Sequence, residues 1–134
     1  RATCCNPVPG DPIIGYISKG KGITVYRVDC PNISNLREED RQRLINVNWD
    51  TPDSNRKYYV DLQVVSEERK GIFKDISKVC DDYDIEVVGL NLTPGEPGTT
   101  NTLITVEITD MHQMQRLLTA LRQVEGVIRV YRPR

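Results

Sequence analysis

Histidine, tryptophan and phenylalanine each occur only once among the 134 residues of this chain. The single histidine, His112, has no cysteine or carboxylate pattern around it, so we expect an ordinary surface residue and not a catalytic base or a metal ligand. No combination of a nucleophile with an activating base is recognisable elsewhere in the sequence. The sequence therefore offers no candidate catalytic residue.

Long apolar runs are missing as well. No run of 18 apolar residues occurs, and no charged segment followed by an apolar one opens the chain, so we predict neither a transmembrane helix nor a signal peptide, and no membrane partner. The chain opens with Arg1, without a Met, at the start of a motif, which suggests a piece of a longer protein. Four cysteines without a secretory leader fit a reducing, cytoplasmic location better than a disulfide scaffold.

A surplus of one charge is the third feature that the chain lacks. Its 18 Lys and Arg residues stand against 19 Asp and Glu residues. Residues 1–51 carry a net charge of +1, and residues 58–134 carry −3. A protein that grips nucleic acid by charge alone has a marked basic surplus. Any contact with RNA must therefore come from a local basic cluster.

The first part of the chain, residues 1–51, contains three cysteines among many turn-forming residues. Cys4 and Cys5 are adjacent, and Cys30 follows two β-rich runs that a Lys-Gly-Lys-Gly turn joins into a predicted hairpin. So short a segment cannot bury a large core, which indicates a small module centred on the thiols.

Two further elements are expected in this module. A polar N-cap at Asn35 predicts a helix through about Leu44. Residues 47–49 look like a short returning strand, in which the only tryptophan, Trp49, is a packing anchor.

Residues 52–57 are polar or proline and form a predicted linker to a second domain, residues 58–134. Alternating and helical apolar patterns there give the order β-α-β-β-α-β, which is the ferredoxin-like arrangement. The elements are expected at 58–65, 69–83, 85–92 and 103–109, then in a helix capped by Asp110 and a strand at 127–131. The chain is thus predicted to be an α+β protein.

Two motifs connect these modules with a known family. The segment from Cys4 to Asn32 resembles the conserved-cysteine, zinc-finger-like module near the C-terminus of long RelA/SpoT stringent-response proteins. The run from Glu68 to Ile76 resembles the Asp-Arg-x-Gly-Leu-Leu-x-Asp-Ile motif of ACT domains, and the run from Val124 to Val130 resembles the ACT ending. The resemblance covers nearly the whole chain.

This resemblance implies a C-terminal regulatory fragment of a protein that makes or breaks (p)ppGpp. The parent would be a GTP pyrophosphokinase, a guanosine-3′,5′-bis(diphosphate) 3′-diphosphatase, or both, and the sequence leaves the choice open. The family's two catalytic centres lie upstream of the cysteine module, so we expect no enzyme activity from this fragment. Its implied work is to dock on the ribosome and on deacylated tRNA and to relay amino-acid starvation to the catalytic domains.

The resemblance also implies a metal site, with one departure. The family pattern joins the equivalents of Cys4, Cys5 and Cys30 with a histidine, and this chain has Tyr26 at that position. A tyrosine of ordinary pKa, about 10, is a poor zinc ligand at neutral pH, and structural zinc sites have four protein ligands. Two alternatives stay open: a zinc site with partial occupancy, or thiols that pack as small buried hydrophobes.

For the ACT domain, the resemblance implies an amino-acid site and a dimer. Gly71 lies where a helix N-terminus can meet a carboxylate, and the site extends to Lys70, Ile72, Gly89 and Asn91, in part across a homodimer. The alternative is that Gly71 only allows tight packing. A rival function is that of an amino-acid receptor, for which a branched-chain amino acid is the natural ligand. Two apolar sets are expected to drive self-association: Val60, Leu62 and Val64, and Val88, Leu90 and Leu92.

Contacts with RNA are assigned to the predicted hairpin of the first module. Lys19, Lys21 and Arg27 lie on or beside it, and the glycines between them would let backbone amides follow phosphates. The alternative is a solvated basic face. Since only a few phosphate contacts are available, binding should be weak and sensitive to salt.

Overall fold

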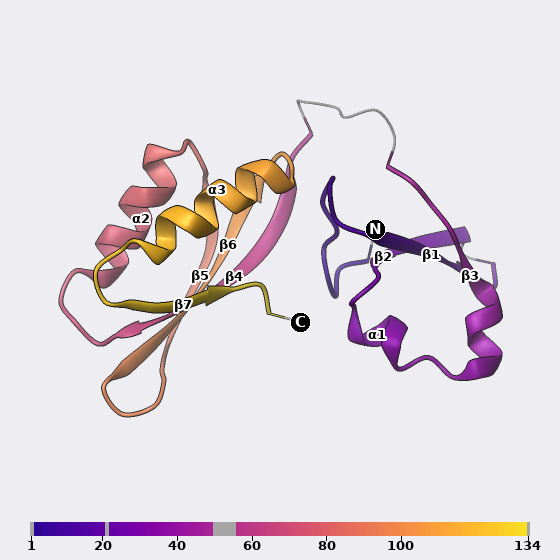
Figure 1. Cartoon of the computed structure of the whole chain (residues 1–134), viewed down its shortest axis with the longest axis horizontal. Coiled ribbons are helices and arrows are strands. Elements are labelled where there is room, and N and C mark those ends of the chain that lie inside the picture. Colours follow the sequence, from indigo (N-terminus) through magenta and orange to yellow (C-terminus); the bar gives the residue numbers. More distant parts are fainter. Residues whose placement is uncertain (1, 21, 50–55, 134) are drawn as a thin grey trace.

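The computed structural model describes residues 2–20, 22–49 and 56–133 and contains two separate antiparallel sheets (Figure 1). The first has three strands in the order β2-β1-β3, and the second has four in the order β5-β6-β4-β7. We refer to residues 2–49 as the thiol module and to residues 56–133 as the ACT-like domain. No helix in the described part of the chain is long and apolar enough to cross a membrane.

The thiol module is a hairpin followed by short helical turns and a third strand. The predicted hairpin is confirmed: β1 (Ile13–Ser18) pairs with β2 (Gly22–Arg27) in an antiparallel register. The chain then forms a short helix α1 (Pro31–Ser34), the 3₁₀ helix η1 (Glu38–Arg43) and a two-residue strand β3 (Leu44–Ile45). Its small core contains Ala2, Cys5, Cys30 and Ile33.

The single helix expected from Asn35 to Leu44 is wrong. The first helical turn starts earlier, at Pro31, because proline suits the first helical position. It ends when the Asn35 N–H turns back to the carbonyls of Pro31 and Ile33. Leu44 then pairs with Tyr16 of β1, so the returning strand lies at 44–45 instead of 47–49.

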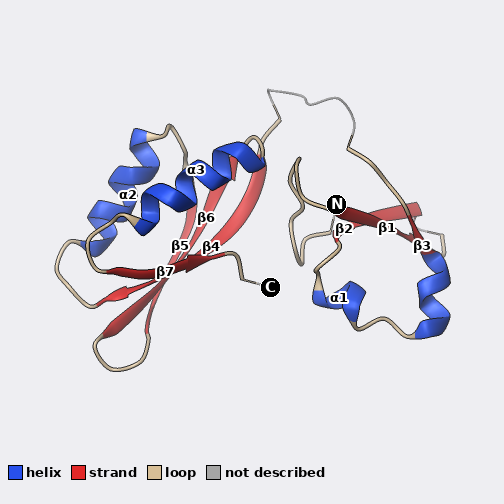
Figure 2. Ribbon diagram, in the orientation of Figure 1, coloured by secondary structure: helices blue, strands red, loops and turns tan. Residues whose placement is uncertain are grey.

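The second domain has the predicted βαββαβ order, with both helices on one side of the sheet (Figure 2). Its elements are β4 (Tyr58–Glu67), α2 (Ile72–Asp82), β5 (Val87–Pro94), β6 (Thr99–Ile108), α3 (Met111–Arg122) and β7 (Val127–Tyr131). Asp110 caps α3 as expected, since its carboxylate accepts the Gln113 N–H at 2.9 Å. The predicted α+β class and ferredoxin-like arrangement are confirmed.

One of the two apolar sets was assigned to the wrong surface. Val60, Leu62 and Val64 of β4 are at most 1% exposed, because they lie on the sheet face that the helices cover. Leu90 and Leu92 pair with buried residues of β6 and share that face, but β5 is an edge strand and both leucines are more than 40% exposed. Of the two predicted sets, only the one on this edge strand is therefore left uncovered by the helices.

Candidate functional site

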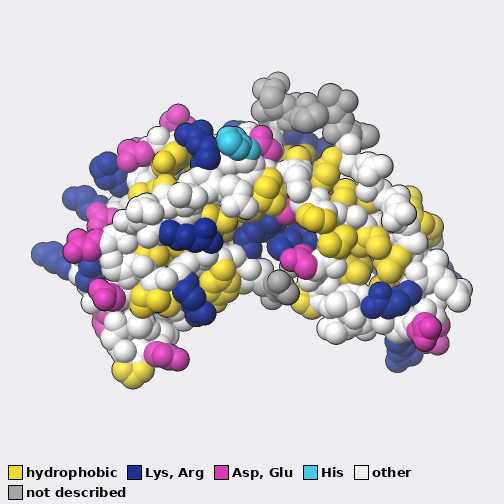
Figure 3. All heavy atoms as spheres, in the orientation of Figure 1, with side chains coloured by type: hydrophobic (Ala, Val, Ile, Leu, Met, Phe, Trp, Pro, Cys, Tyr) yellow, Lys and Arg dark blue, Asp and Glu magenta, His cyan; other side chains and the backbone are white. Residues whose placement is uncertain are grey.

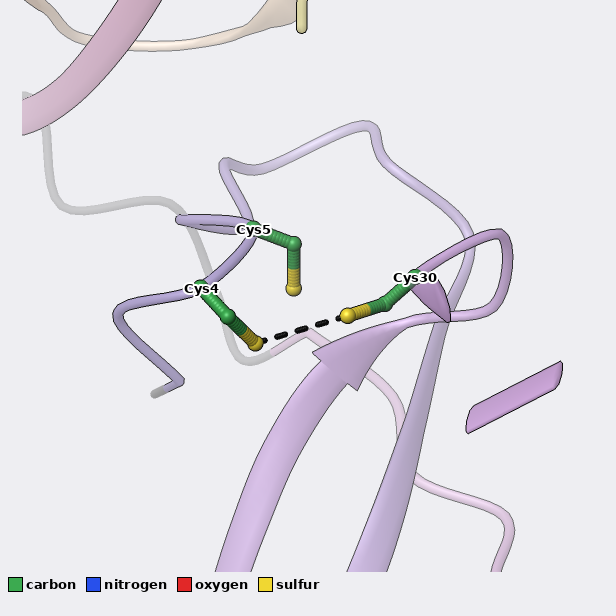
Figure 4. A group of neighbouring side chains, drawn as sticks. All are labelled: Cys4, Cys5 and Cys30. Carbon is green, nitrogen blue, oxygen red and sulfur yellow. Dashed lines mark hydrogen bonds between the residues drawn. The ribbon is translucent and has the colours of Figure 1, made fainter. Parts of the chain in front are cut away.

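The three cysteines of the thiol module lie close together. Cys4 and Cys5 belong to the turn that leads into β1, and Cys30 directly precedes α1. Figure 4 shows their sulfur atoms directed toward one another. All three sulfur atoms lie within 4.8 Å of one another, and those of Cys4 and Cys30 are 3.4 Å apart. The sequence prediction that these residues meet is confirmed.

The surroundings of the cluster keep Cys5 protonated. Burial raises the pKa of the Cys5 thiol to about 12, although a hydrogen bond from the Arg27 backbone N–H at 3.3 Å favours the thiolate. The Tyr26 ring packs against the same cluster. Burial and the neighbouring thiols raise the pKa of the Tyr26 hydroxyl as well, so the phenol stays neutral at physiological pH. Cys5 can lose its proton near pH 7 only if a cation takes its place.

This donor set fits a thiophilic cation with three protein ligands. Zinc lies about 2.3 Å from thiolate sulfur, so ligands in tetrahedral geometry are about 3.8 Å apart, which is the scale of this cluster. Tyr26 is a poor fourth ligand, because burial and the neighbouring thiols raise the pKa of its hydroxyl further above neutral pH. The cluster can therefore hold an ion whose fourth position is left to water. Zinc itself stays a prediction.

The predicted amino-acid loop lies at the start of α2. Gly71 is the N-cap of this helix and has a φ of +81°, in the left-handed region. Lys70 is exposed beside it, and Ile72 is buried in the core. Arg69 fastens the loop, since its guanidinium donates to Asp75 Oδ2 at 2.6 Å and to the Glu125 carbonyl at 2.9 Å.

The other two residues of the predicted amino-acid site lie elsewhere on the sheet. Gly89 pairs with Thr105 and Asn91 with Leu103, in the middle of β6, whereas the loop before α2 meets the β5–β6 turn through Glu68 N–H and the Gly98 carbonyl at 2.9 Å. One chain therefore does not bring Gly71 together with Gly89 and Asn91 in the described structure, so a joint site would need a second copy.

Sequence reasoning missed two buried hydroxyl groups in this domain. Ser66 and Thr102 are fully buried, and their hydroxyls have no hydrogen-bond partner among the described residues. They lie near the end of β4 from which the chain passes to α2. Small polar residues in an apolar alternation were the only signal for them.

The predicted RNA-binding residues have unequal positions. Lys19 is exposed at the tip of the β1–β2 hairpin, and Lys21 lies outside the described residues. Arg27 does not reach into solvent: its side chain is 12% exposed and pairs with Asp29 at 2.7 Å. On the face seen in Figure 3, Lys and Arg side chains are interspersed with Asp and Glu. His112 is exposed on the first turn of α3, as expected.

The hairpin also carries an apolar feature beside the residues predicted to contact RNA. Ile17 and Ile23 are directly opposite each other in the register, and they are 43% and 54% exposed. Gly20, at the tip, has a φ of +72° and open space around it. The hairpin end therefore combines an apolar pair, a lysine and accessible backbone.

Comparison with known proteins agrees with the two-module fold. Residues 54–132, more than half of the chain, match the ACT domain family. The chain belongs to the ACT domain family. Residues 1–50 match the RelA/SpoT RIS domain, so the thiol module corresponds to a RIS domain and an ACT domain follows it in the chain.

Curated relatives match both halves of the chain within much longer proteins. The chain is 34% identical over 131 residues to a GTP pyrophosphokinase of Streptomyces coelicolor and to the bifunctional (p)ppGpp synthase/hydrolase RelA of Mycobacterium tuberculosis. It is 33% identical over 128 residues to a GTP pyrophosphokinase of Escherichia coli. These matches cover 95% to 98% of this chain but only 15% to 18% of the relatives.

A solved structure supports the fold of the second half. The ACT domain from the GTP pyrophosphokinase of Chlorobium tepidum superposes with a TM-score of 0.51 at 20% identity, and the match covers 58% of this chain and all of that one. The suspected relation to the RelA/SpoT proteins is thus confirmed for both halves of the chain.

Proposed function

We propose that this chain is the regulatory region of a RelA/SpoT-type (p)ppGpp synthetase or hydrolase, which docks on the ribosome and deacylated tRNA and relays amino-acid starvation to catalytic domains elsewhere in the parent. The observation that carries the proposal is the β1–β2 hairpin end. An isoleucine pair that is half exposed in a small module is a costly surface to leave in water, and it lies beside Lys19 and accessible backbone. Such a mixed surface suits a ribonucleoprotein, which offers phosphates and apolar groups together.

The role of each group follows from its chemistry. Lys19 supplies charge to a phosphate, whereas Ile17 and Ile23 supply apolar area and no charge. Arg27 contributes little, because Asp29 already neutralises it. Few phosphates are contacted, so the affinity of the chain alone is low and binding is lost readily as the salt concentration rises.

Cosedimentation with ribosomes carrying deacylated tRNA, measured over a series of salt concentrations, tests this proposal. Lys19→Glu should weaken binding and reduce the salt slope by about one. The double variant Ile17→Ala/Ile23→Ala should weaken binding with the slope unchanged. Lys74→Glu changes an exposed lysine on α2 and serves as the matched control. Equal loss in Lys19→Glu and Lys74→Glu would contradict docking through the hairpin.

A second candidate function is a receptor for a branched-chain amino acid. The observation that favours it is the start of α2, which no described side chain caps, whereas Asp110 caps α3. The free N–H groups of the first turn and the helix dipole suit a carboxylate. Gly89 and Asn91 would join the site from a second copy of the chain.

Thermal unfolding with valine, isoleucine and unrelated amino acids separates the two candidates. A ligand at 100 times its dissociation constant stabilises the folded state by about 2.7 kcal/mol, which raises the melting temperature measurably. Asn91→Ala should remove the shift and leave the unliganded melt unchanged, because Asn91 is exposed. Absence of any shift leaves the ACT domain as a docking and dimerisation surface.

A further inference from the structure

The turn that follows the cysteines lies against the ACT domain. We call residues 6–11 the strap. Val8, in its middle, is fully buried and belongs to the same hydrophobic cluster as the β4 and α3 side chains. The carbonyl of Pro9 accepts the N–H of Met111, the first residue of α3, at 2.9 Å. The strap thus fills the core of the second domain and satisfies an N–H group that a helix start leaves unpaired.

The approach at Gly10 is too close for any other residue. Gly10 has a φ of +104°, and a Cβ placed on it would lie 2.6 Å from Met111 Cβ. Both the backbone conformation and the contact with α3 require glycine there. The path of the strap is therefore fixed by packing against the ACT domain.

A buried ion pair closes the strap onto the last strand. Arg132, directly after β7, donates from Nη1 to Asp11 Oδ1 at 2.9 Å and from Nη2 to Asp11 Oδ2 at 3.3 Å. The two side chains are 10% and 4% exposed. Asp11 also accepts the Val8 N–H at 2.9 Å, so the same carboxylate holds both the turn and the arginine. Removing one partner of such a pair leaves an unpaired buried charge.

The ion pair is also linked to the thiol cluster. Arg132 Nη2 donates to the carbonyl of Asn6, the residue after Cys5, at 3.4 Å. A cavity of about 20 Å³, enough for roughly one water, lies between Cys4, Cys5 and Arg132. Figure 1 shows the chain running from the end of β7 toward the first module. Arg132 thus lines the same small cavity as Cys4 and Cys5.

We propose that the strap and its Asp11–Arg132 pair form a latch that couples the thiol cluster to β7 of the ACT domain. A change at the ACT domain that draws Arg132 away opens the turn and exposes the buried thiols. In the opposite direction, modification or ion binding at the thiols is transmitted to the end of β7. The two modules then signal to each other through this contact.

Alkylation of individual cysteines by iodoacetamide, followed by mass spectrometry of the native chain, tests the latch. Cys5 and Cys30 report on the thiol cluster, and Cys80, 1% exposed in the ACT core, reports on global unfolding. Arg132→Gln should raise the alkylation rate of Cys5 and Cys30 at least about tenfold with Cys80 unchanged, because only the local opening becomes easier. Arg129→Gln is the control: it removes the same charge from an exposed β7 residue that stacks on Tyr131.

The result that would overturn the proposal is equal alkylation of Cys5 and Cys30 in the two variants. An equal rise in the alkylation rate of Cys80 would also overturn it. The ion pair would then stabilise the fold as a whole and would not control a local opening at the thiols. Asp11→Asn, which keeps the shape of the side chain, gives a second route to the same opening. If the latch acts as one unit, the double variant Asp11→Asn/Arg132→Gln raises the rate by less than the product of the two single effects.

Discussion

Gly71 has a backbone conformation that an L-residue with a Cβ adopts only with strain. Its φ is +81°, and the nearest side-chain atom to an added Cβ is Arg69 Nη1 at 3.8 Å, so space is available and the dihedral decides. Gly71→Ala should therefore lower the free energy of unfolding by about 1 to 2 kcal/mol. Gly71→Asn should cost less, since asparagine tolerates this region. Urea denaturation measures both, and equal costs would contradict the argument from strain.

Tyr26 is the residue that limits metal binding at the thiol cluster. We expect substoichiometric zinc in the purified chain by elemental analysis, because three thiols supply only three of the four usual ligands. Tyr26→His should raise the zinc content toward one ion per chain, whereas Tyr26→Phe should leave it unchanged. One tightly held zinc per wild-type chain would show that water suffices as the fourth ligand.

Cys80 makes the stability of the ACT domain fall at alkaline pH. Burial raises the pKa of its thiol from 9.0 to about 11. Between these values the unfolded chain has lost the thiol proton and the folded chain retains it, so stability is complete below pH 9 and falls as the pH rises toward 11. The slope is on the order of 1 kcal/mol per pH unit. Denaturation curves of Cys80→Ala should fall less steeply, and parallel curves would refute the assignment.

Among the elements, β5 carries a row of exposed apolar side chains on an edge strand. Val88, Leu90 and Leu92 are 46%, 43% and 45% exposed on an edge strand. Uncovered apolar edges favour pairing with another strand, so we expect two copies to associate through β5. Leu90→Lys should yield a monomer by light scattering. Ile128→Lys, at an exposed position on the opposite edge strand, should leave the dimer intact. A monomeric wild type would contradict the prediction.

Elements with a regular spacing of apolar residues were predictable from the sequence. Element bounds that depend on contacts between distant residues were not. The alternation at Val60, Leu62 and Val64 located β4, although it could not tell which face the helices cover. The helix expected from Arg69 begins only at Ile72, because Arg69 instead binds Asp75 and Glu125. The contact between Arg69 and Glu125 spans 56 residues and leaves no local signal in the sequence.

In the candidate sites, too, contacts within a local motif were predictable and contacts between distant residues were not. The three cysteines were expected to meet because the motif places two before the first strand of a hairpin and one after the second strand. An antiparallel hairpin brings these two positions together. The Asp11–Arg132 pair joins residues 121 positions apart, and neither lies in a pattern that suggests its partner. Arg27 looked available for RNA, and only the structure shows that Asp29 engages it.

At the scale of the whole molecule, the ACT domain depends on a segment outside its sequence boundaries. A chain of residues 56–134 alone would lose Val8 from its core, at a cost of about 1.5 to 3 kcal/mol, and the Pro9 acceptor at α3. It should therefore unfold at a lower urea concentration than the complete chain. Val8→Ala in the complete chain should reproduce part of the loss. Equal midpoints for the two lengths would contradict this dependence.

The only tryptophan of the chain lies at this junction. The Trp49 indole N–H donates to the Asp11 carbonyl at 3.0 Å, and its ring meets Tyr58 edge to face, with centroids 6.2 Å apart. All indole fluorescence therefore comes from the place where the two modules touch. Separation of the modules would expose the indole to water and move its emission to longer wavelength. The protein thus carries its own optical reporter of the junction, readable in real time and without a label.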